Sequence, residues 1–118
     1  MIDLIFVDSS INKPRGREFV NKLVDKSGLN PLWVSFNTFE KCRADYTAKL
    51  IVLFGGPARS FIHKSLPPTG EGHVIGDTTY IPWHDTYYLF MANRKYEVKT
   101  LELFSRIKEK LDAELVKA

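Results

Sequence analysis

Residues 49–59 read KLIVLFGGPAR, and no other stretch indicates the fold as clearly. Residues 49–54 form a nearly unbroken apolar run, which is typical of a strand buried on both faces of a sheet. Gly55 and Gly56 then turn the chain, and Pro57 suits the first turn of a helix. This stretch therefore predicts a buried strand followed by a short helix.

The same alternation continues outward in both directions. Strands are predicted at residues 2–7, 32–36 and 73–82 (the last as two short pieces), and helices at 15–27 and 96–116. Gly28 suits the C-cap of the first helix, and Asn37 or Thr38 could cap a short helix that carries Cys42. This order predicts one three-layer α/β/α domain over residues 1–118, with about four mostly parallel strands.

The composition limits the classes of protein to consider. At 118 residues and 13.6 kDa the chain suits a single core. No apolar run reaches the roughly 20 residues of a membrane helix, and we expect no secretion signal. Cys42 is the only cysteine, which excludes an internal disulfide and favours a cytoplasmic protein. The histidines lack metal-ligand spacing, so neither a metal nor a cofactor is expected.

Parallel sheets bind ligands at the carboxyl ends of their strands. That rule selects the predicted loops Asp8–Arg15, Asn37–Cys42 and Trp83–Asn93, with Gly55–Arg59 at the same edge. Asp8 follows a buried strand directly, as catalytic carboxylates and ordinary turn residues both do. The two glycines could offer N–H groups to an anion, although plain tight-turn geometry explains them better, because the spacing of a nucleotide-binding loop is missing.

Basic and aromatic residues interleave near this edge. The basic residues are Lys13, Arg15, Arg17, Lys41, Arg43, Arg59, Lys64, Arg94 and Lys95. Trp83, Tyr87 and Tyr88 lie among them in the sequence. Lysine and arginine bind phosphates and aromatic rings stack on bases, so the pattern indicates contact with DNA, either single-stranded or duplex. The alternative is an ordinary solvated surface, because the net charge is only +3.

Five segments carry a resemblance to a known family. They read DLIFVDSS (3–10), GREFV (16–20), SFNTFEKCR (35–43), LIVLFGGPA (50–58) and IPWHDTYYL (81–89). In this order they resemble the uracil-DNA glycosylase superfamily, most closely its iron–sulfur branch, in a shortened form. The resemblance implies a uracil-DNA glycosylase-like fold. Three of the four cysteines that hold the cluster in that branch are missing here.

The resemblance also implies roles for individual residues. Phe19 would stack on a flipped-out base, and Asn37 would read its edge, with Thr38 as the competing position. His84 would stabilise charge on the leaving base. The family's glycine-rich first motif is replaced here, so Asp8 would have to orient the attacking water. Each residue also has a plain interpretation: Phe19 as core, Asn37 as a helix cap and His84 as a loop histidine.

The leading hypothesis is a nucleic-acid-binding domain that recognises a flipped or unpaired base. Arg15, Arg17, Lys41, Arg43 and Arg59 would contact the nucleic-acid backbone. Hydrolysis of the N-glycosidic bond is left open. The alternative is an inactive accessory protein that binds a replication or repair partner through the aromatic residues of 83–90. A third hypothesis is a small-molecule hydrolase or transferase that uses Asp8 and His84.

Overall fold

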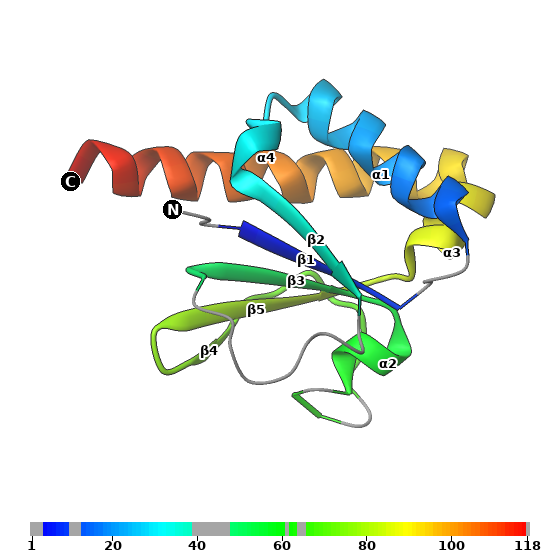
Figure 1. Ribbon diagram of the computed structural model, residues 1–118, viewed down its shortest axis with the longest axis horizontal. Helices are drawn as coiled ribbons and strands as arrows, with labels where there is room; N and C mark the ends of the chain where they lie inside the picture. Colours follow the sequence, from blue (N-terminus) through cyan, green and yellow to red (C-terminus); the bar gives the residue numbers. More distant parts are fainter. Residues whose placement is uncertain (1–3, 10–12, 39–47, 61, 64–65, 118) are drawn as a thin grey trace.

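The computed structural model describes residues 4–9, 13–38, 48–60, 62–63 and 66–117 (Figure 1). Within these ranges, the side chains of residues 8, 33, 36–38, 93–94 and 114–117 are not described. The elements are β1 (Leu4–Asp8), α1 (Pro14–Ser27), the 3-10 turn η1 (Pro31–Trp33), β2 (Val34–Thr38), β3 (Leu50–Phe54), α2 (Gly56–Arg59), β4 (His73–Ile75), β5 (Thr78–Trp83), α3 (Thr86–Met91) and α4 (Asn93–Lys117).

The five strands form one sheet in the order β2-β1-β3-β5-β4. Four of them are parallel, and β4 is an antiparallel edge strand, so the sheet is mixed. The fifth strand arises because Gly76 and Asp77 make a tight turn that folds β4 back onto β5, and Gly76 has a φ of 62°. The α/β class and the two-piece strand at 73–82 are therefore confirmed, and the count of about four strands was one too low.

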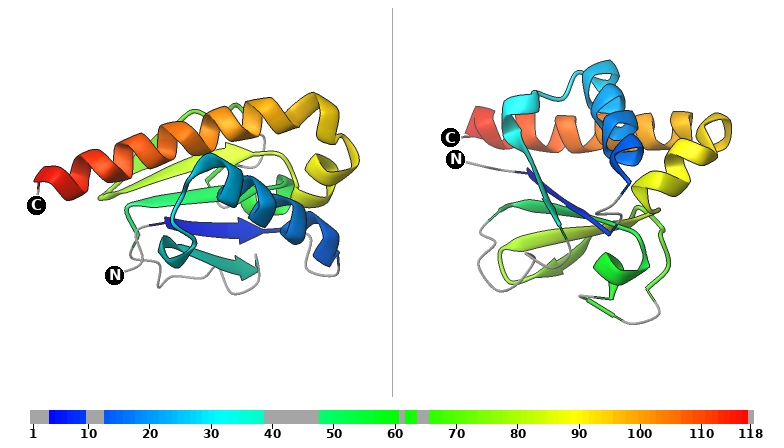
Figure 2. Two further views of the ribbon diagram at one scale, coloured as in Figure 1. Left: turned by 90° about the horizontal axis from the view of Figure 1, so that it is seen from above. Right: turned by 45° about the vertical axis from the view of Figure 1, so that its right-hand side comes forward.

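The helices cover the two faces of the sheet unequally. The large core lies between the sheet and α1, α3 and α4, whereas α2 packs on a smaller cluster at the opposite face. Figures 1 and 2 show α1, α3 and α4 together on one side and α2 on the other. All five residues of β3 are buried, as expected for a central strand with both faces covered.

Most predicted boundaries hold within a few residues. Gly28 caps α1 in the left-handed conformation, with a φ of 81°, and the C-terminal helix is three residues longer at its start than predicted. The second strand begins at Val34 and not at Leu32, because the Asn30 side chain accepts a hydrogen bond from the Leu32 N–H and starts a 3-10 turn.

Two predicted loops at the carboxyl edge have other bounds in the structure. The stretch 83–93 is not a loop throughout, because the Asp85 carboxylate caps the N-terminus of α3. Asn37 and Thr38 belong to strand β2, and the short helix predicted after them, with Cys42, lies outside the described residues. The short helix predicted after β3 is confirmed as the single turn α2, which ends at Arg59.

The aromatic core ties the sheet to α4. The Phe6 ring lies between Phe54, at 5.1 Å in an edge contact, and Phe104 of α4, stacked at 5.3 Å. The buried Trp83 indole donates from Nε1 to the Thr100 hydroxyl of α4 at 3.0 Å. These contacts fix the long helix across strands β1, β3 and β5.

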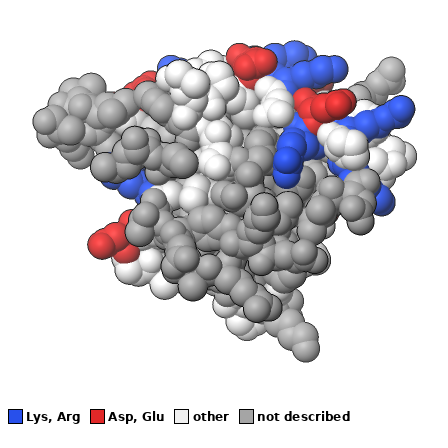
Figure 3. All heavy atoms as spheres, in the orientation of Figure 1, with Lys and Arg blue, Asp and Glu red and all other residues white. Residues whose placement is uncertain are grey.

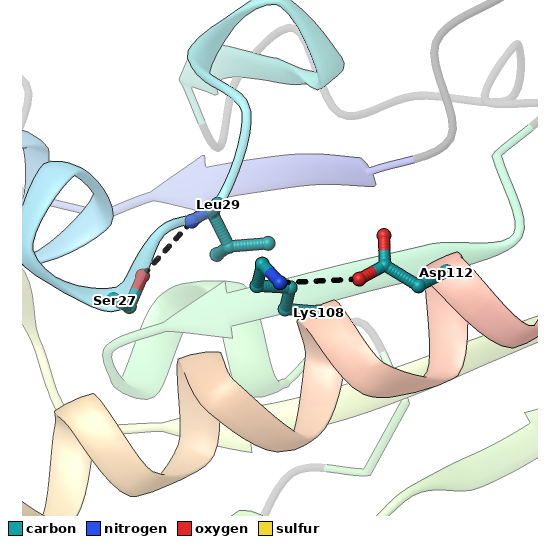
Figure 4. Close-up of polar contacts among 4 residues, drawn as sticks. All are labelled: Ser27, Leu29, Lys108 and Asp112. Atoms are coloured by element: carbon teal, nitrogen blue, oxygen red, sulfur yellow. Dashed lines mark hydrogen bonds and ion pairs between the residues drawn. The ribbon is translucent and has the colours of Figure 1, made fainter.

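The C-terminal end of α1 rests beside α4 (Figure 4). The Ser27 hydroxyl donates to the Val24 carbonyl and accepts from the Leu29 N–H. A Cβ at Gly28 would lie 3.4 Å from Cε of Lys108, whose ammonium group pairs with Asp112 at 3.2 Å. That separation is ordinary van der Waals contact, so the positive φ of Gly28, and not a lack of space, favours glycine at this position.

The N-terminal ends of α1 and α3 are in close contact. A Cβ at Gly16 would lie 2.6 Å from the Tyr87 backbone nitrogen and 2.7 Å from the Thr86 carbonyl carbon. These are backbone atoms, which cannot swing aside as a flexible side chain can. Gly16 therefore sets the distance between the two helices.

We predict that Gly16→Ala destabilises the protein by about 1–3 kcal/mol, because the added methyl group overpacks the contact between α1 and α3. Urea denaturation measures the change. The matched control is Gly56→Ala, whose Cβ would meet only Arg59 Nη2 at 3.9 Å. That control should leave stability unchanged or raise it by up to about 1 kcal/mol. Equal stability of the two variants would contradict the prediction.

Candidate functional site

The carboxyl ends of the four parallel strands meet at one edge of the sheet. In the strand register, Asp8 is level with Thr38 and Phe54, and Phe54 is level with Trp83. After β1 the chain crosses to β2 on one side, and after β3 it crosses to β5 on the other. The sheet therefore has its topological switch point between β1 and β3, which is where ligands bind in folds of this kind.

The switch point is closely packed by its own residues. The Ser9 N–H donates to the Phe54 carbonyl, and the Ser9 hydroxyl accepts from the Ala58 N–H at 3.0 Å. Gly55 has a φ of 99°, and a Cβ there would lie 2.8 Å from both Ser9 and Asp85 Oδ2. The Gly55 N–H donates to the Trp83 carbonyl at 3.2 Å. This glycine therefore makes a tight turn and does not offer its N–H to an anion.

Asp85 organises the chain just beyond β5. Its Oδ1 accepts hydrogen bonds from the N–H groups of Tyr87 at 2.9 Å and Tyr88 at 3.4 Å. Its Oδ2 faces Gly55, and its charge acts on Arg59 of α2. The carboxylate thus caps α3 and places α3 next to the switch point.

Arg59 turns inward from α2. Its Nε donates to the Leu66 carbonyl and its Nη1 to the Trp83 carbonyl, both at 2.9 Å. Burial lowers the pKa of the Arg59 guanidinium, and the Asp85 charge opposes that shift. The sequence suggested a phosphate contact for Arg59, but two of its donor atoms instead hold backbone carbonyls around β5.

His84 is half-buried between aromatic rings. Its ring centroid lies 4.3 Å from that of Tyr96, 5.5 Å from Tyr88 and 5.2 Å from Trp83. Burial lowers the pKa of His84 below its ordinary value of 6.5, and the positive charges of Arg59, Lys99 and Lys95 lower it further. The neutral imidazole therefore predominates at pH 7, with one nitrogen that donates a hydrogen bond and one that accepts.

Two tyrosines and two lysines complete the surroundings of His84. The Tyr88 and Tyr96 rings lie 5.5 Å apart, and their hydroxyl hydrogen bond raises the pKa of Tyr88 and lowers that of Tyr96. The Lys95 and Lys99 ammonium groups lie 5.4 and 5.9 Å from the centre of the Tyr96 ring. We call these five residues, His84, Tyr88, Lys95, Tyr96 and Lys99, the aromatic–lysine surface.

Phe19 lies on the other side of α3. Its ring contacts Phe90 at 6.3 Å, and Phe90 contacts Tyr87, over which Lys13 places its ammonium group at 4.2 Å. A hollow of about 230 Å³ is lined here by Arg15, Glu18, Phe19, Lys22 and Phe90. The structure therefore brings Phe19 together with Arg15, whereas the ring contacts of His84 are made to other residues.

The remaining predicted site residues are described in part or not at all. Asp8 ends β1 and Asn37 lies one position before the end of β2, but the side chains of both are undescribed. Arg17 is half-buried on α1, and Lys41 and Arg43 lie outside the described residues. The backbone register thus brings Asp8 and Asn37 to the same edge as His84 without showing where their side chains point.

Sequence reasoning missed Tyr96 and Lys99 as partners of His84. Both belong to the first turns of α4. The amphipathic pattern of that helix predicts only that one face packs on the sheet and that the other faces solvent. A usable signal was present, because Lys95 and Lys99 are four residues apart and flank Tyr96 on a helical surface. Only the packing of α3 against α4 brings them to His84.

Charge on this side of the molecule is mixed. Figure 3 shows lysine and arginine side chains gathered over α1, with acidic side chains among them.

Within the described ranges, no three His, Cys, Asp or Glu side chains come together in a group that could hold a metal ion. None of the described helices is long and apolar enough to cross a membrane.

We predict that NMR titration gives His84 a pKa below 6.5, and that Lys99→Gln raises it because a nearby positive charge is removed. The control Lys108→Gln should leave the pKa unchanged, because Lys108 pairs with Asp112 beside Gly28. A pKa at or above 6.5 in the wild-type protein would contradict the prediction.

The same shift sets a dependence of stability on pH. Because the pKa of His84 is lower in the folded chain, the unfolded chain binds more protons as the pH falls from about 6.5 toward the folded value. The free energy of unfolding should therefore decrease over this window. Urea denaturation at pH 7.5 and pH 5.5 should show a smaller decrease for His84→Gln than for the wild-type protein.

A comparison of this chain with protein-family models finds no match, and a comparison with curated proteins finds none either.

Proposed function

We propose that the protein binds unpaired nucleic acid through the aromatic–lysine surface. The observation that carries this proposal is the placement of two lysine ammonium groups within 6 Å of the Tyr96 ring centre, next to the rings of Tyr88 and His84. Tyr88 is 45% exposed, so a base can stack on it. Stacking on aromatic rings with lysines at the phosphates is how single strands are held without sequence preference.

We propose further that His84 recognises a flipped base. A neutral imidazole can donate one hydrogen bond and accept another, which suits the edge of a pyrimidine. The resemblance to uracil-DNA glycosylases supports this role and a uracil-DNA glycosylase-like arrangement of the sheet. Should the N-glycosidic bond be hydrolysed, His84 would donate a hydrogen bond to the oxygen of the leaving base, and Asp8 would orient the water.

A second candidate function is an accessory protein that binds a replication or repair partner. Large apolar side chains are exposed on α3 and α4, where Met91 is 65% and Val98 62% exposed. Together with Tyr88 they offer apolar contact area that nucleic acid does not require. An apolar protein interface differs from phosphate binding in its weak dependence on salt.

The binding proposal is tested by fluorescence anisotropy with labelled single-stranded DNA at several salt concentrations. Lys95→Gln with Lys99→Gln should weaken binding and reduce the salt slope by about 0.7 for each phosphate that these lysines neutralise. Tyr88→Ala should weaken binding by about 1–3 kcal/mol if one base stacks there. Lys108→Gln, which removes one positive charge elsewhere on the same helix, is the control and should bind as the wild-type protein does. Binding that is insensitive to salt, to the double lysine substitution and to Tyr88→Ala would contradict the proposal and favour the protein-partner function.

The catalytic step has its own test, which is excision from single-stranded and duplex DNA that contains uracil. An active glycosylase should release uracil, and His84→Ala should lower the rate by about 10²–10³-fold, as the removal of one oxyanion donor does elsewhere. Binding by the wild-type protein without release would limit the function to recognition. Excision unaffected by His84→Ala would contradict the role given to His84.

A further inference from the structure

The hollow between α1 and α3 has aromatic lining residues that solvent reaches. Its volume is about 230 Å³, and Phe19 of α1 and Phe90 of α3 are the aromatic residues of its lining. Both are half-buried, and their ring centroids lie 6.3 Å apart in an edge-to-face arrangement. Each side chain therefore keeps part of its surface open to a bound group. Covering that surface with another aromatic ring would be favourable.

Three charged side chains of α1 complete the lining. Arg15 comes four residues before Phe19 and Lys22 three residues after it, so the two cations bracket that ring, about 10 Å apart along the helix axis. Glu18 lies between them at spacings that permit ion pairs. Neither cation, however, forms an ion pair with it or with any other described side chain. Both cations are exposed and can therefore pair with an anionic partner.

The surroundings of the hollow add further positive charge. The Lys13 ammonium group lies 4.2 Å from the centre of the Tyr87 ring, and that ring contacts Phe90 at 6.0 Å. Figure 3 shows lysine and arginine side chains gathered over α1. The cations at and beside the hollow thus outnumber its one lining carboxylate, Glu18. Electrostatic complementarity therefore favours an acidic partner.

The volume of the hollow limits the group that it can hold. About 230 Å³ corresponds to roughly eight water molecules at about 30 Å³ each. Pockets for small-molecule ligands typically begin at about 300 Å³. The hollow is therefore too small for a cofactor-sized molecule and suits one large side chain, such as a tryptophan that anchors a protein partner.

We propose that this hollow is a docking site for an acidic peptide segment of a partner protein, anchored by one tryptophan. The indole ring packs against Phe19 and Phe90, and its N–H donates to the Glu18 carboxylate. Acidic residues on either side of the tryptophan pair with Arg15 and Lys22. A nucleotide fits less well, because the phosphates on both sides of its base would approach Glu18 as well as the cations.

The docking site is independent of the proposed nucleic-acid surface. It lies on the other side of α3 from the aromatic–lysine surface, and the two share no residue. Lys95→Gln with Lys99→Gln should therefore leave peptide binding at the hollow unchanged, whatever it does to the binding of DNA.

The test is an NMR titration of the ¹⁵N-labelled protein with the acetylated and amidated pentapeptide Glu-Asp-Trp-Asp-Glu. Saturable shifts are expected at the backbone amides of residues 15–22 and of Phe90. Replacing the tryptophan of the peptide by alanine should weaken binding at least about tenfold, because the anchor is lost. The uncharged peptide Gln-Asn-Trp-Asn-Gln should bind at least about threefold more weakly, with little dependence on salt.

Variants of the protein assign the binding to the hollow. Arg15→Gln with Lys22→Gln should weaken the acidic peptide at least about threefold and leave the uncharged peptide unchanged. The matched control is Arg106→Gln with Lys110→Gln, which removes the same two charges from exposed positions of α4 and should bind as the wild-type protein does. Phe90→Leu keeps an apolar side chain but removes the ring, and it should weaken both peptides.

Two kinds of result would overturn the proposal. One is the absence of a saturable shift with the acidic peptide, or full affinity after the Arg15 and Lys22 substitutions or after Phe90→Leu. The other is tighter binding of single-stranded oligothymidylate than of the acidic peptide at the same amides, which would assign the hollow to nucleic acid.

Discussion

The candidate site depends on the hydrogen bonds that hold Trp83 at the end of β5. Its carbonyl accepts from the Gly55 N–H at 3.2 Å and from Nη1 of Arg59 at 2.9 Å. Its indole Nε1–H donates to Thr100 inside the core. One residue is thereby fixed to β3, α2 and α4 at once. His84 and Asp85 follow it directly, so their positions are set before any ligand arrives.

The electrostatics at His84 follow from that arrangement. Arg59 is drawn inward by two carbonyl groups, where its positive charge acts on His84 together with Lys95 and Lys99 of α4. Burial and these charges both favour the neutral imidazole. A neutral histidine among aromatic rings and lysines suits hydrogen bonding to a base, because it can donate and accept at once.

Close packing of the helices divides the aromatic residues of α3 between two surfaces. Gly16 lets α1 approach the first turn of α3, so Tyr87 and Phe90 meet Phe19 and Lys13 there. Tyr88 instead meets His84. Phe19 and His84 therefore make their ring contacts to different residues. Gly55, at the switch point between β1 and β3, is a turn residue, because its N–H donates to the Trp83 carbonyl.

Elements with local signals could be predicted from the amino-acid order alone. The apolar run of β3, the left-handed Gly28 at the end of α1 and the amphipathic pattern of α4 each depend on neighbours within a turn or a strand. The inward turn of Arg59 and the 4.3 Å approach of Tyr96 to His84 emerge only in the folded chain. These contacts join segments far apart in the chain, and helix packing selects them, so no periodic pattern in the sequence encodes them.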